Sequence, residues 1–146
     1  MSINKLEEKL KVAKSQNKLP KILIPVHLAG SSCDMKKIYE LSLEYKFKII
    51  EDASHAMGGK YQKYKVGSCK YSDITIFSFH PVKIITTGEG GIITTNNPKI
   101  AKIIKQLRNH GITKDPSDFR NEEKGSWVYE QQFLGLNYRV TEIQAA

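Results

Sequence analysis

Hydrophobic positions recur along the start of the chain first with the spacing of a helix and then with that of a strand. Leu6 and Leu10 are separated by charged residues, which predicts a short amphipathic helix over residues 5–16. The apolar run at residues 21–27 predicts a strand, and Pro25 within it indicates where that strand ends. The chain is therefore expected to open with a peripheral helix followed by a buried strand.

A second helix and a second strand follow a short loop. Asp34 is a residue type typical of N-caps, so a helix is expected from there to about Tyr45. Its inward-facing side chains are predicted to be Met35, Ile38, Leu41 and Leu43. Residues 47–51 then return as an apolar strand. Strand, helix and strand within roughly 30 residues predict a right-handed βαβ unit, and so an α/β fold with an open, mostly parallel sheet and flanking helices.

Two further strands and a third helix are predicted downstream. The β-branched run at 74–77 predicts a strand, and residues 92–95 predict another. The connection between them is too short for a parallel crossover, so the second of these strands is expected to be antiparallel. A helix is expected over 99–108, opened by the Asn-Pro pair at 97–98, whereas the polar, poorly periodic residues 109–129 predict a long surface loop.

The end of the sequence has the pattern of a helix start. Thr141 and Gln144 form a Thr-x-x-Gln capping box, but only one turn of chain follows it. The interpretation is that residues 1–146 are part of a larger domain.

Composition narrows the class of protein. With 40% hydrophobic and 26% charged residues in 146, the chain is expected to be globular. No apolar run approaches the roughly 20 residues that cross a bilayer, and Glu7 and Glu8 interrupt the N-terminal segment where a signal peptide would be apolar. These features favour a cytoplasmic protein with no membrane partner.

The cysteines and histidines give no metal or disulfide pattern. Cys33 and Cys69 are far apart and form no Cys-x-x-Cys motif, which favours reduced thiols. Together with the four histidines they lack the spacing of zinc ligands, so no metal site is expected.

A net charge of +8 makes nucleic acid a candidate partner. The clearest candidate is residues 60–65, where tyrosines alternate with lysines. However, the basic residues are nearly all lysines, and they are scattered along the chain. Solvated lysines or an anionic phosphorylated ligand explain the charge more simply, so no nucleic-acid partner is expected.

Polar side chains follow the ends of successive predicted strands. Asp52 and His55 come after the strand at 47–51, and Ser78 ends the third strand just before the turn that carries Lys83. Ligands of open α/β sheets bind beyond the carboxyl ends of the strands, so these four side chains are expected to converge there. Two simpler alternatives are that Asp52 only caps a turn and that Lys83 is a solvated surface amine.

Four blocks of the sequence resemble successive motifs of one enzyme family, in the same order and with the same spacing. They are residues 25–30, 51–58, 78–91 and 134–146, and the third reads Ser-Phe-His-Pro-x-Lys-x-x-Thr-x-Gly-Glu-Gly-Gly. The chain resembles the DegT/StrS sugar aminotransferases, which are pyridoxal-phosphate enzymes of fold type I. The sequence of these blocks is most similar to that of family members from the pseudaminic acid pathway. The resemblance implies a partial large, cofactor-binding domain, without the family's N-terminal part and its C-terminal small domain.

The resemblance also implies roles for single residues. Lys83 would hold pyridoxal 5′-phosphate as a Schiff base and shuttle a proton, which makes it catalytic together with Asp52, the partner of the pyridine nitrogen. Ser78 would bind the cofactor phosphate, and Ala53 and His55 would lie beside the ring. The family's sugar dehydratases have histidine in place of the lysine, so Lys83 favours transamination.

Other implied contacts concern the substrate and a second subunit. Asn137 is the expected phosphate contact from a segment that reaches the neighbouring subunit of a homodimer. Arg139 and His80 are expected to bind substrate.

Three functions remain open at this point. The first is transfer of an amino group, from glutamate, to C4 of a UDP-linked 4-keto-6-deoxy-N-acetylhexosamine. The second is a non-catalytic remnant that keeps the motifs but cannot hold cofactor by itself. The third is a basic nucleic-acid-binding module.

Overall fold

The computed structural model describes residues 1–120, 125 and 127–146. They form two compact units, residues 1–96 and residues 97–146, and each is described by itself. No helix among these residues has the length and apolar character needed to cross a membrane.

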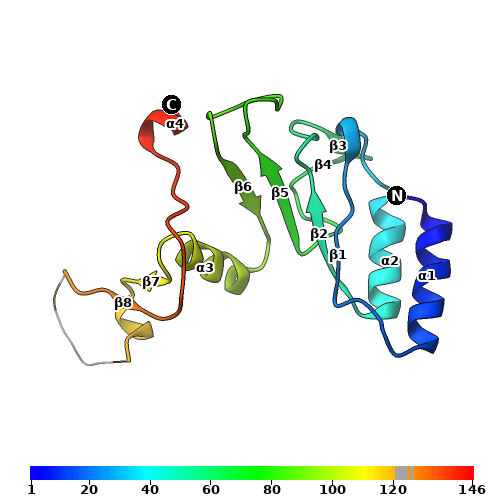
Figure 1. Cartoon of the computed structure of the whole chain (residues 1–146), viewed down its shortest axis with the longest axis horizontal. Helices are drawn as coiled ribbons and strands as arrows, with labels where there is room; N and C mark the ends of the chain where they lie inside the picture. Colours follow the sequence, from blue (N-terminus) through cyan, green and yellow to red (C-terminus); the bar gives the residue numbers. More distant parts are fainter. Residues whose placement is uncertain (121–124, 126) are drawn as a thin grey trace. The chain divides into compact units, whose positions relative to one another are not determined.

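Unit 1 is built on a four-stranded sheet (Figure 1). Its strands lie in the order β1 (Ile22–Leu23), β2 (Lys48–Asp52), β5 (Ile74–Ser78) and β6 (Gly91–Thr94). The first three are parallel, and β6 runs antiparallel to β5. The predicted open, mostly parallel α/β sheet is confirmed, as is the antiparallel direction of its last strand.

The first strand is shorter than the predicted 21–27. Only two residues of β1 form the ladder with β2, and the chain rejoins it as a single bridge between Val26 and Asp52. Pro25 lies in the interruption, and proline has no backbone N–H to contribute to a ladder.

Two helices lie side by side on one face of the sheet (Figure 1). In α1 (Ile3–Ser15) the Ser2 hydroxyl accepts a hydrogen bond from the N–H of Lys5, and in α2 (Met35–Tyr45) Asp34 accepts from Lys37, which confirms it as the cap. The core between these helices and the sheet consists of Leu6, Leu10, Cys33, Met35, Ile38, Leu41, Tyr45, Phe47 and Ile49.

One inward position of α2 was predicted wrongly. Leu43 is 63% exposed, whereas Ser42 and Tyr45 are buried. A helical period of 3.6 residues continues from Met35 and Ile38 to positions 42 and 45, and so turns position 43 toward solvent.

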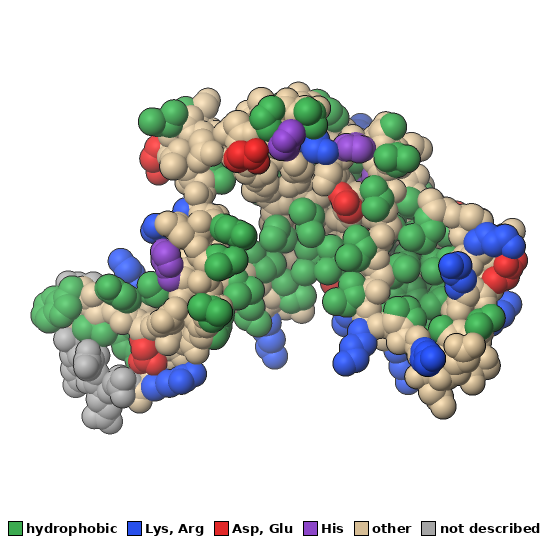
Figure 2. Space-filling model, viewed as in Figure 1, with side chains coloured by type: hydrophobic (Ala, Val, Ile, Leu, Met, Phe, Trp, Pro, Cys, Tyr) green, Lys and Arg blue, Asp and Glu red, His purple; other side chains and the backbone are tan. Residues whose placement is uncertain are grey.

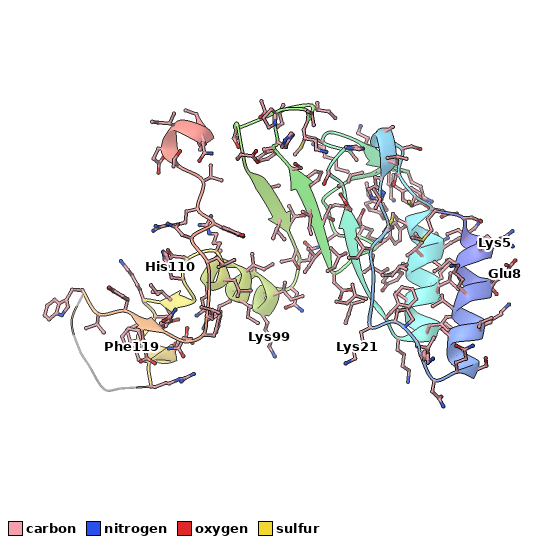
Figure 3. All side chains as sticks on the ribbon, in the orientation of Figure 1. Lys5, Glu8, Lys21, Lys99, His110 and Phe119 are labelled. Atoms are coloured by element: carbon pink, nitrogen blue, oxygen red, sulfur yellow. The ribbon has the colours of Figure 1, made fainter. Side chains whose placement is uncertain are left out.

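The outer surface of α1 is charged. Figure 3 labels Lys5 and Glu8 there, and their side chains form an ion pair of 2.7 Å. Lys21, labelled in the same view, precedes β1 at the amino end of the sheet. These charges lie away from the edge where β2 and β5 end.

A small hairpin not predicted from the sequence follows β2. It pairs β3 (Lys60–Tyr61) with β4 (Tyr64–Lys65) through a two-residue turn in which Gln62 has a left-handed φ of 54°. Strands of two residues are too short to produce a hydrophobic alternation, which is why the pattern gave no signal.

Unit 2 contains α3 (Pro98–Leu107), whose cap is Asn97 as the Asn-Pro pair predicted.

Part of the predicted loop over 109–129 is ordered structure, namely β7 (Ile112–Thr113) and the 3-10 turn η2 (Pro116–Asp118). Residues 121–124 and 126 of that loop lie outside the described residues. β7 pairs with β8 (Glu130–Gln131), and the Thr141–Gln144 capping box of α4 (Glu142–Ala145) is confirmed.

Candidate active site

Parallel pairing of β2 and β5 brings Asp52 and Ser78 to the same edge of the sheet. Asp52 is the register partner of Ile76, and Ser78 is two residues further along β5. The Ser78–Gly91 connection closes this edge above β5 and β6 (Figure 1). In Figure 2, histidine, lysine and acidic side chains gather along the upper edge over these strands.

Both backbone polar groups of Asp52 are held by the chain at residues 25–27. Its N–H donates to Pro25 O at 2.9 Å, and its C=O accepts from His27 N at 2.9 Å. Its side-chain Oδ1 accepts from the N–H of Ser54 at 3.1 Å. Asp52 therefore does cap a turn, and the same contact fixes the carboxylate at the edge.

The surroundings of Asp52 favour its ionised form. The hydroxyl of Ser54 does most to lower the pKa of the Asp52 carboxyl, partial burial opposes this, and the Ser54 N–H lowers it further. The nearby imidazole of His55 and the ammonium of Lys83 also lower the pKa. Asp52 is thus a half-buried carboxylate within electrostatic range of the candidate lysine.

Lys83 lies on the turn between β5 and β6. Its backbone N–H donates to His80 O at 2.9 Å, and its side chain is half-buried. The Lys83 ammonium makes no hydrogen bond or ion pair with any residue that the structure describes. This amine differs from the solvated lysines of the surface, since it is partly enclosed next to an acidic group.

Hydrogen bonds within the turn hold Lys83 and its neighbours in place. Ser78 Oγ accepts from the N–H of His80 at 3.3 Å, and His80 Nδ1 accepts from the N–H of Val82 at 3.3 Å. Further along, Thr86 Oγ1 donates to Phe79 O at 2.8 Å. His80 itself is exposed. The turn is thus built from its own polar side chains.

Ala53 and His55 follow Asp52 in the loop beyond β2. Ala53 is fully buried beside Phe77, and its N–H donates to Ile76 O at 2.8 Å. His55 is half-buried, and its Nδ1 accepts from the N–H of Ala29 at 3.3 Å. These predicted site residues lie on the same loop as Asp52.

Asn137 and Arg139 belong to unit 2. Both are exposed, and Arg139 Nε donates to Asn137 Oδ1 at 3.0 Å. Asn137 also forms a bridge with Asn109. Within unit 2 the two side chains therefore form one polar pair.

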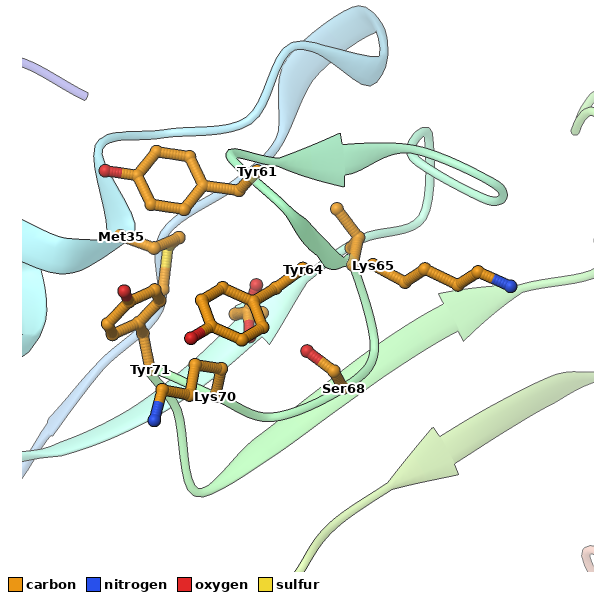
Figure 4. Close-up of a pocket in the computed structure, with 9 residues that line it drawn as sticks. Met35, Tyr61, Tyr64, Lys65, Ser68, Lys70 and Tyr71 are labelled. Carbon is orange, nitrogen blue, oxygen red and sulfur yellow. The ribbon is translucent and has the colours of Figure 1, made fainter.

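The two tyrosines of residues 60–65 belong to an aromatic cluster (Figure 4). The rings of Tyr61 and Tyr64 both meet the ring of Tyr71 edge-on, each at a centroid distance of 5.8 Å. The Tyr61 hydroxyl donates to Asp34 Oδ1 at 2.6 Å. These rings are occupied in packing the hairpin against α2, so they are poorly placed to stack on bases.

A buried polar network that was not predicted from the sequence lies beside the site. His27 is 0% exposed and Glu51 5% exposed, and His27 Nε2 lies 2.8 Å from Glu51 Oε2. Thr75 Oγ1 donates to Glu51 Oε1 at 3.0 Å, and Ser72 also hydrogen-bonds that oxygen. The available signal was the alternation of β2, which places Glu51 on the face opposite Asp52 and so inside the core.

The sequence matches one protein family and curated relatives within it. The model of the DegT/DnrJ/EryC1/StrS aminotransferase family matches residues 2–146. The chain is 43% identical over 121 residues to the UDP-4-amino-4,6-dideoxy-N-acetyl-beta-L-altrosamine transaminase of Campylobacter jejuni, covering 83% of this chain and 29% of that protein.

Solved structures of aminotransferases have a similar fold. PseC of Helicobacter pylori, an aminotransferase involved in the biosynthesis of pseudoaminic acid, superposes with a TM-score of 0.78 and 32% identity over 94% of this chain and 34% of its own. The sugar aminotransferase Spr1654 of Streptococcus pneumoniae in its PLP form gives a TM-score of 0.70 at 32% identity, over 86% of this chain and 34% of its own.

The chain spans less than a third of the length of the curated relative from Campylobacter. The family match nevertheless extends over nearly all of the chain, and it includes the strand ends and the lysine turn described above. The chain belongs to the DegT/DnrJ/EryC1/StrS aminotransferase family.

Proposed function

We propose that the protein supplies the cofactor-binding core for transfer of an amino group from glutamate to the C4 keto group of a UDP-linked 4-keto-6-deoxy-N-acetylhexosamine. The observation that carries this proposal is the placement of an ionised carboxylate, Asp52, within electrostatic range of a half-buried amine, Lys83, at one sheet edge. An acid and an amine so placed are the two groups that pyridoxal 5′-phosphate chemistry requires of a protein.

Pyridoxal 5′-phosphate is the cofactor of this reaction, and the residues of unit 1 fit it. Asp52 offers a carboxylate whose pKa is lowered by Ser54, His55 and Lys83, so it stays charged opposite a pyridinium N–H. Ser78 offers a hydroxyl at the same edge. When bound, the cofactor ring supplies an electron sink for the carbon that loses its proton.

Lys83 is the residue to which we assign covalent binding of the cofactor aldehyde. Released from that bond, its Nζ would carry a proton between the substrate carbon and the cofactor carbon. The turn described above holds its backbone through His80 O, so the flexible part of Lys83 is its side chain. The Lys83 amine can therefore move while the Lys83 backbone stays in place.

The remaining residues are assigned to binding. Ser78 would hold the cofactor phosphate, with Asn137 as a second phosphate contact supplied by the partner subunit of a homodimer. Ala53 and His55 would lie against the ring. Arg139 and His80 would contact the substrate, and a guanidinium suits the diphosphate of a nucleotide sugar.

The sugar class rests on relatives. The Campylobacter relative is named for a UDP-linked amino sugar, and the Helicobacter neighbour is described as acting in pseudoaminic acid biosynthesis. We infer the same class of substrate here, in a cytoplasmic pathway of nucleotide-sugar synthesis.

The other two functions have less support. A nucleic-acid-binding module would need free aromatic rings among its lysines, but Tyr61 and Tyr64 pack against Tyr71. If the protein cannot hold cofactor, it is a non-catalytic remnant. The experiment below distinguishes that function from an enzyme.

The test is incubation with pyridoxal 5′-phosphate, glutamate and the UDP-linked 4-keto sugar, followed by mass spectrometry. It compares the gene product that carries this sequence with the 146-residue chain alone. The gene product should form 2-oxoglutarate and the 4-amino sugar in equal amounts, whereas the chain alone is expected to bind cofactor weakly and not to turn over. The same keto sugar linked to GDP is the control for the nucleotide.

Each result has a distinct meaning. A covalent cofactor adduct without any amino sugar would reject the proposed activity but keep the cofactor site. Neither adduct nor product from either protein would favour the non-catalytic remnant. Steady turnover by the 146-residue chain would show that the expected need for further chain is wrong.

A further inference from the structure

His27 and Glu51 form a buried pair beside the candidate site. The His27 ring is fully buried, and both of its nitrogens have partners in the protein. Nδ1 accepts from the backbone N–H of Cys33 at 3.3 Å, and Nε2 lies 2.8 Å from Glu51 Oε2. Because Nδ1 is an acceptor, the ring proton of His27 must be on Nε2, where it is donated to Glu51.

The carboxylate of Glu51 is satisfied on its other side as well. Its Oε1 accepts from the hydroxyls of Thr75, at 3.0 Å, and Ser72. Burial raises the pKa of Glu51 most strongly, but the hydrogen bonds from His27, Ser72 and Thr75 outweigh it and leave the pKa lowered. The network is therefore complete with a neutral His27 and an ionised Glu51, and a buried charge held this way fixes its partners.

His27 also begins the short loop that reaches the site. Its backbone C=O accepts from Gly30 N at 3.2 Å, which closes the 3-10 turn η1 (Leu28–Gly30). Within that turn Ala29 has a left-handed φ of 53°, which aims its N–H at His55 Nδ1, 3.3 Å away. Gly30 has a φ of 81°, and a Cβ on it would lie 3.1 Å from His55 O, so the turn touches both the ring and the backbone of His55.

We propose that Glu51 and His27 are positioning residues for His55, acting through the turn at 28–30. With its Nδ1 occupied by the N–H of Ala29, neutral His55 carries its proton on Nε2. The ring thus presents a hydrogen-bond donor, and a donor of this kind suits an anionic oxygen of the bound ligand. The inference rests on the proposed function only for the identity of that ligand.

A purely structural role for the pair predicts something different. If Glu51 and His27 only fill and satisfy the core, then weakening them lowers stability but leaves the tautomer of His55 unchanged. NMR signals of the ring nitrogens report the tautomer of a histidine directly. The tautomer of His55 therefore distinguishes a positioning role of the pair from a packing role.

The experiment is long-range ¹H–¹⁵N correlation NMR on the protein labelled with ¹⁵N-histidine, with no cofactor added. In the native sequence His27 and His55 should both be Nε2–H tautomers, and for His55 the preference should exceed that of a free imidazole by about fivefold, the size that one hydrogen bond gives. Glu51→Ala should reduce the preference at His55 to that of a free imidazole and speed exchange of the Ala29 N–H. Glu51→Gln keeps an acceptor for His27 and should restore both signals.

The matched control is Ala29→Gly, which retains the N–H and suits the left-handed φ, so it should leave the His55 tautomer unchanged. An Nδ1–H tautomer of His55 in the native sequence would overturn the proposal even if Glu51→Ala fails to fold. An unchanged His55 tautomer in folded Glu51→Ala would overturn it as well. Since no step uses cofactor, these outcomes are independent of the activity test above.

Discussion

Asp52 of β2 is paired in parallel register with Ile76 of β5, and this pairing sets the distance along the sheet between the candidate acid and the lysine turn. β5 continues for two residues beyond Ile76, so Ser78 and the turn that follows it rise past the level of Asp52. A register shifted by one residue would turn Asp52 to the opposite face of the sheet.

Replacement of Lys83 tests the proposed attachment point of the cofactor. Lys83→Ala should abolish the adduct that borohydride reduction traps with pyridoxal 5′-phosphate, because the amine that forms the bond is gone. The fold should be kept, since the residue lies on a turn and its side chain is only half-buried. Peptide mass mapping locates the adduct, and Lys65→Ala, at an exposed lysine of β4, is the control. An adduct that persists in Lys83→Ala would move the assignment to another lysine.

Replacement of Asp52 by its amide tests the role of charge. Asp52→Asn keeps the side-chain oxygen that accepts from the Ser54 N–H, so the local turn should survive. Without the negative charge the pyridinium form loses its partner, and the transamination rate should fall on the order of 100-fold or more. Cofactor should still be trapped by borohydride. Turnover close to that of the native sequence would contradict the assigned role.

Stability at low pH should report on Asp34. The Tyr61 hydroxyl does most to lower the pKa of Asp34, burial opposes this, and Lys37 lowers it further. Ionised Asp34 therefore contributes its full share to the stability of the fold at pH values above the ordinary aspartate pKa of about 3.9. This contribution is lost as the pH falls through the lower pKa of Asp34 in the folded protein. Asp34→Ala removes the helix cap and the acceptor of Tyr61, and should cost about 1–2 kcal/mol at pH 7 in urea unfolding.

Two comparisons sharpen the Asp34 prediction. Asp34→Asn keeps an oxygen acceptor and should lose less stability than Asp34→Ala at neutral pH. The difference between the native sequence and Asp34→Asn should shrink as the pH is lowered below 4. A difference that stays constant down to pH 2 would show that the charge of Asp34 contributes nothing.

A glycine beside the site tests the packing of β5. Gly67 has a φ of 92°, and a Cβ there would lie 2.8 Å from Cζ of the buried Phe77 ring. Gly67→Ala should therefore cost about 2–4 kcal/mol, from backbone strain and from overpacking. Gly58→Ala is the control, since its φ of 77° gives similar strain but no atom lies within 4 Å of the new Cβ. Equal unfolding midpoints for the two variants would show that Phe77 moves freely.

Local rules were enough for much of the fold. The caps at Asp34, Asn97 and Thr141 were predictable because each depends on one side chain and on an N–H two or three residues later. The direction of β6 was predictable from the length of its connection. The position of Asp52 at a strand end followed from the hydrophobic run before it.

The hydrogen-bond partners of the polar side chains around the site were decided by the tertiary structure. Nothing in the neighbourhood of Glu51 indicates that its partner is His27, because the two are 24 residues apart and meet only when β2 pairs beside the chain at 25–27. The same holds for Ala29 and His55, and for Tyr61 and Asp34.

Sequence periodicity thus determined which residues face inward and where elements begin, since those properties depend on neighbours along the chain. The identity of the partner for each buried polar group depends on which strands become adjacent and in what register. A buried carboxylate such as Glu51 is tolerated only where that adjacency supplies donors, so its role could be recognised only once the three-dimensional arrangement of the donors was known.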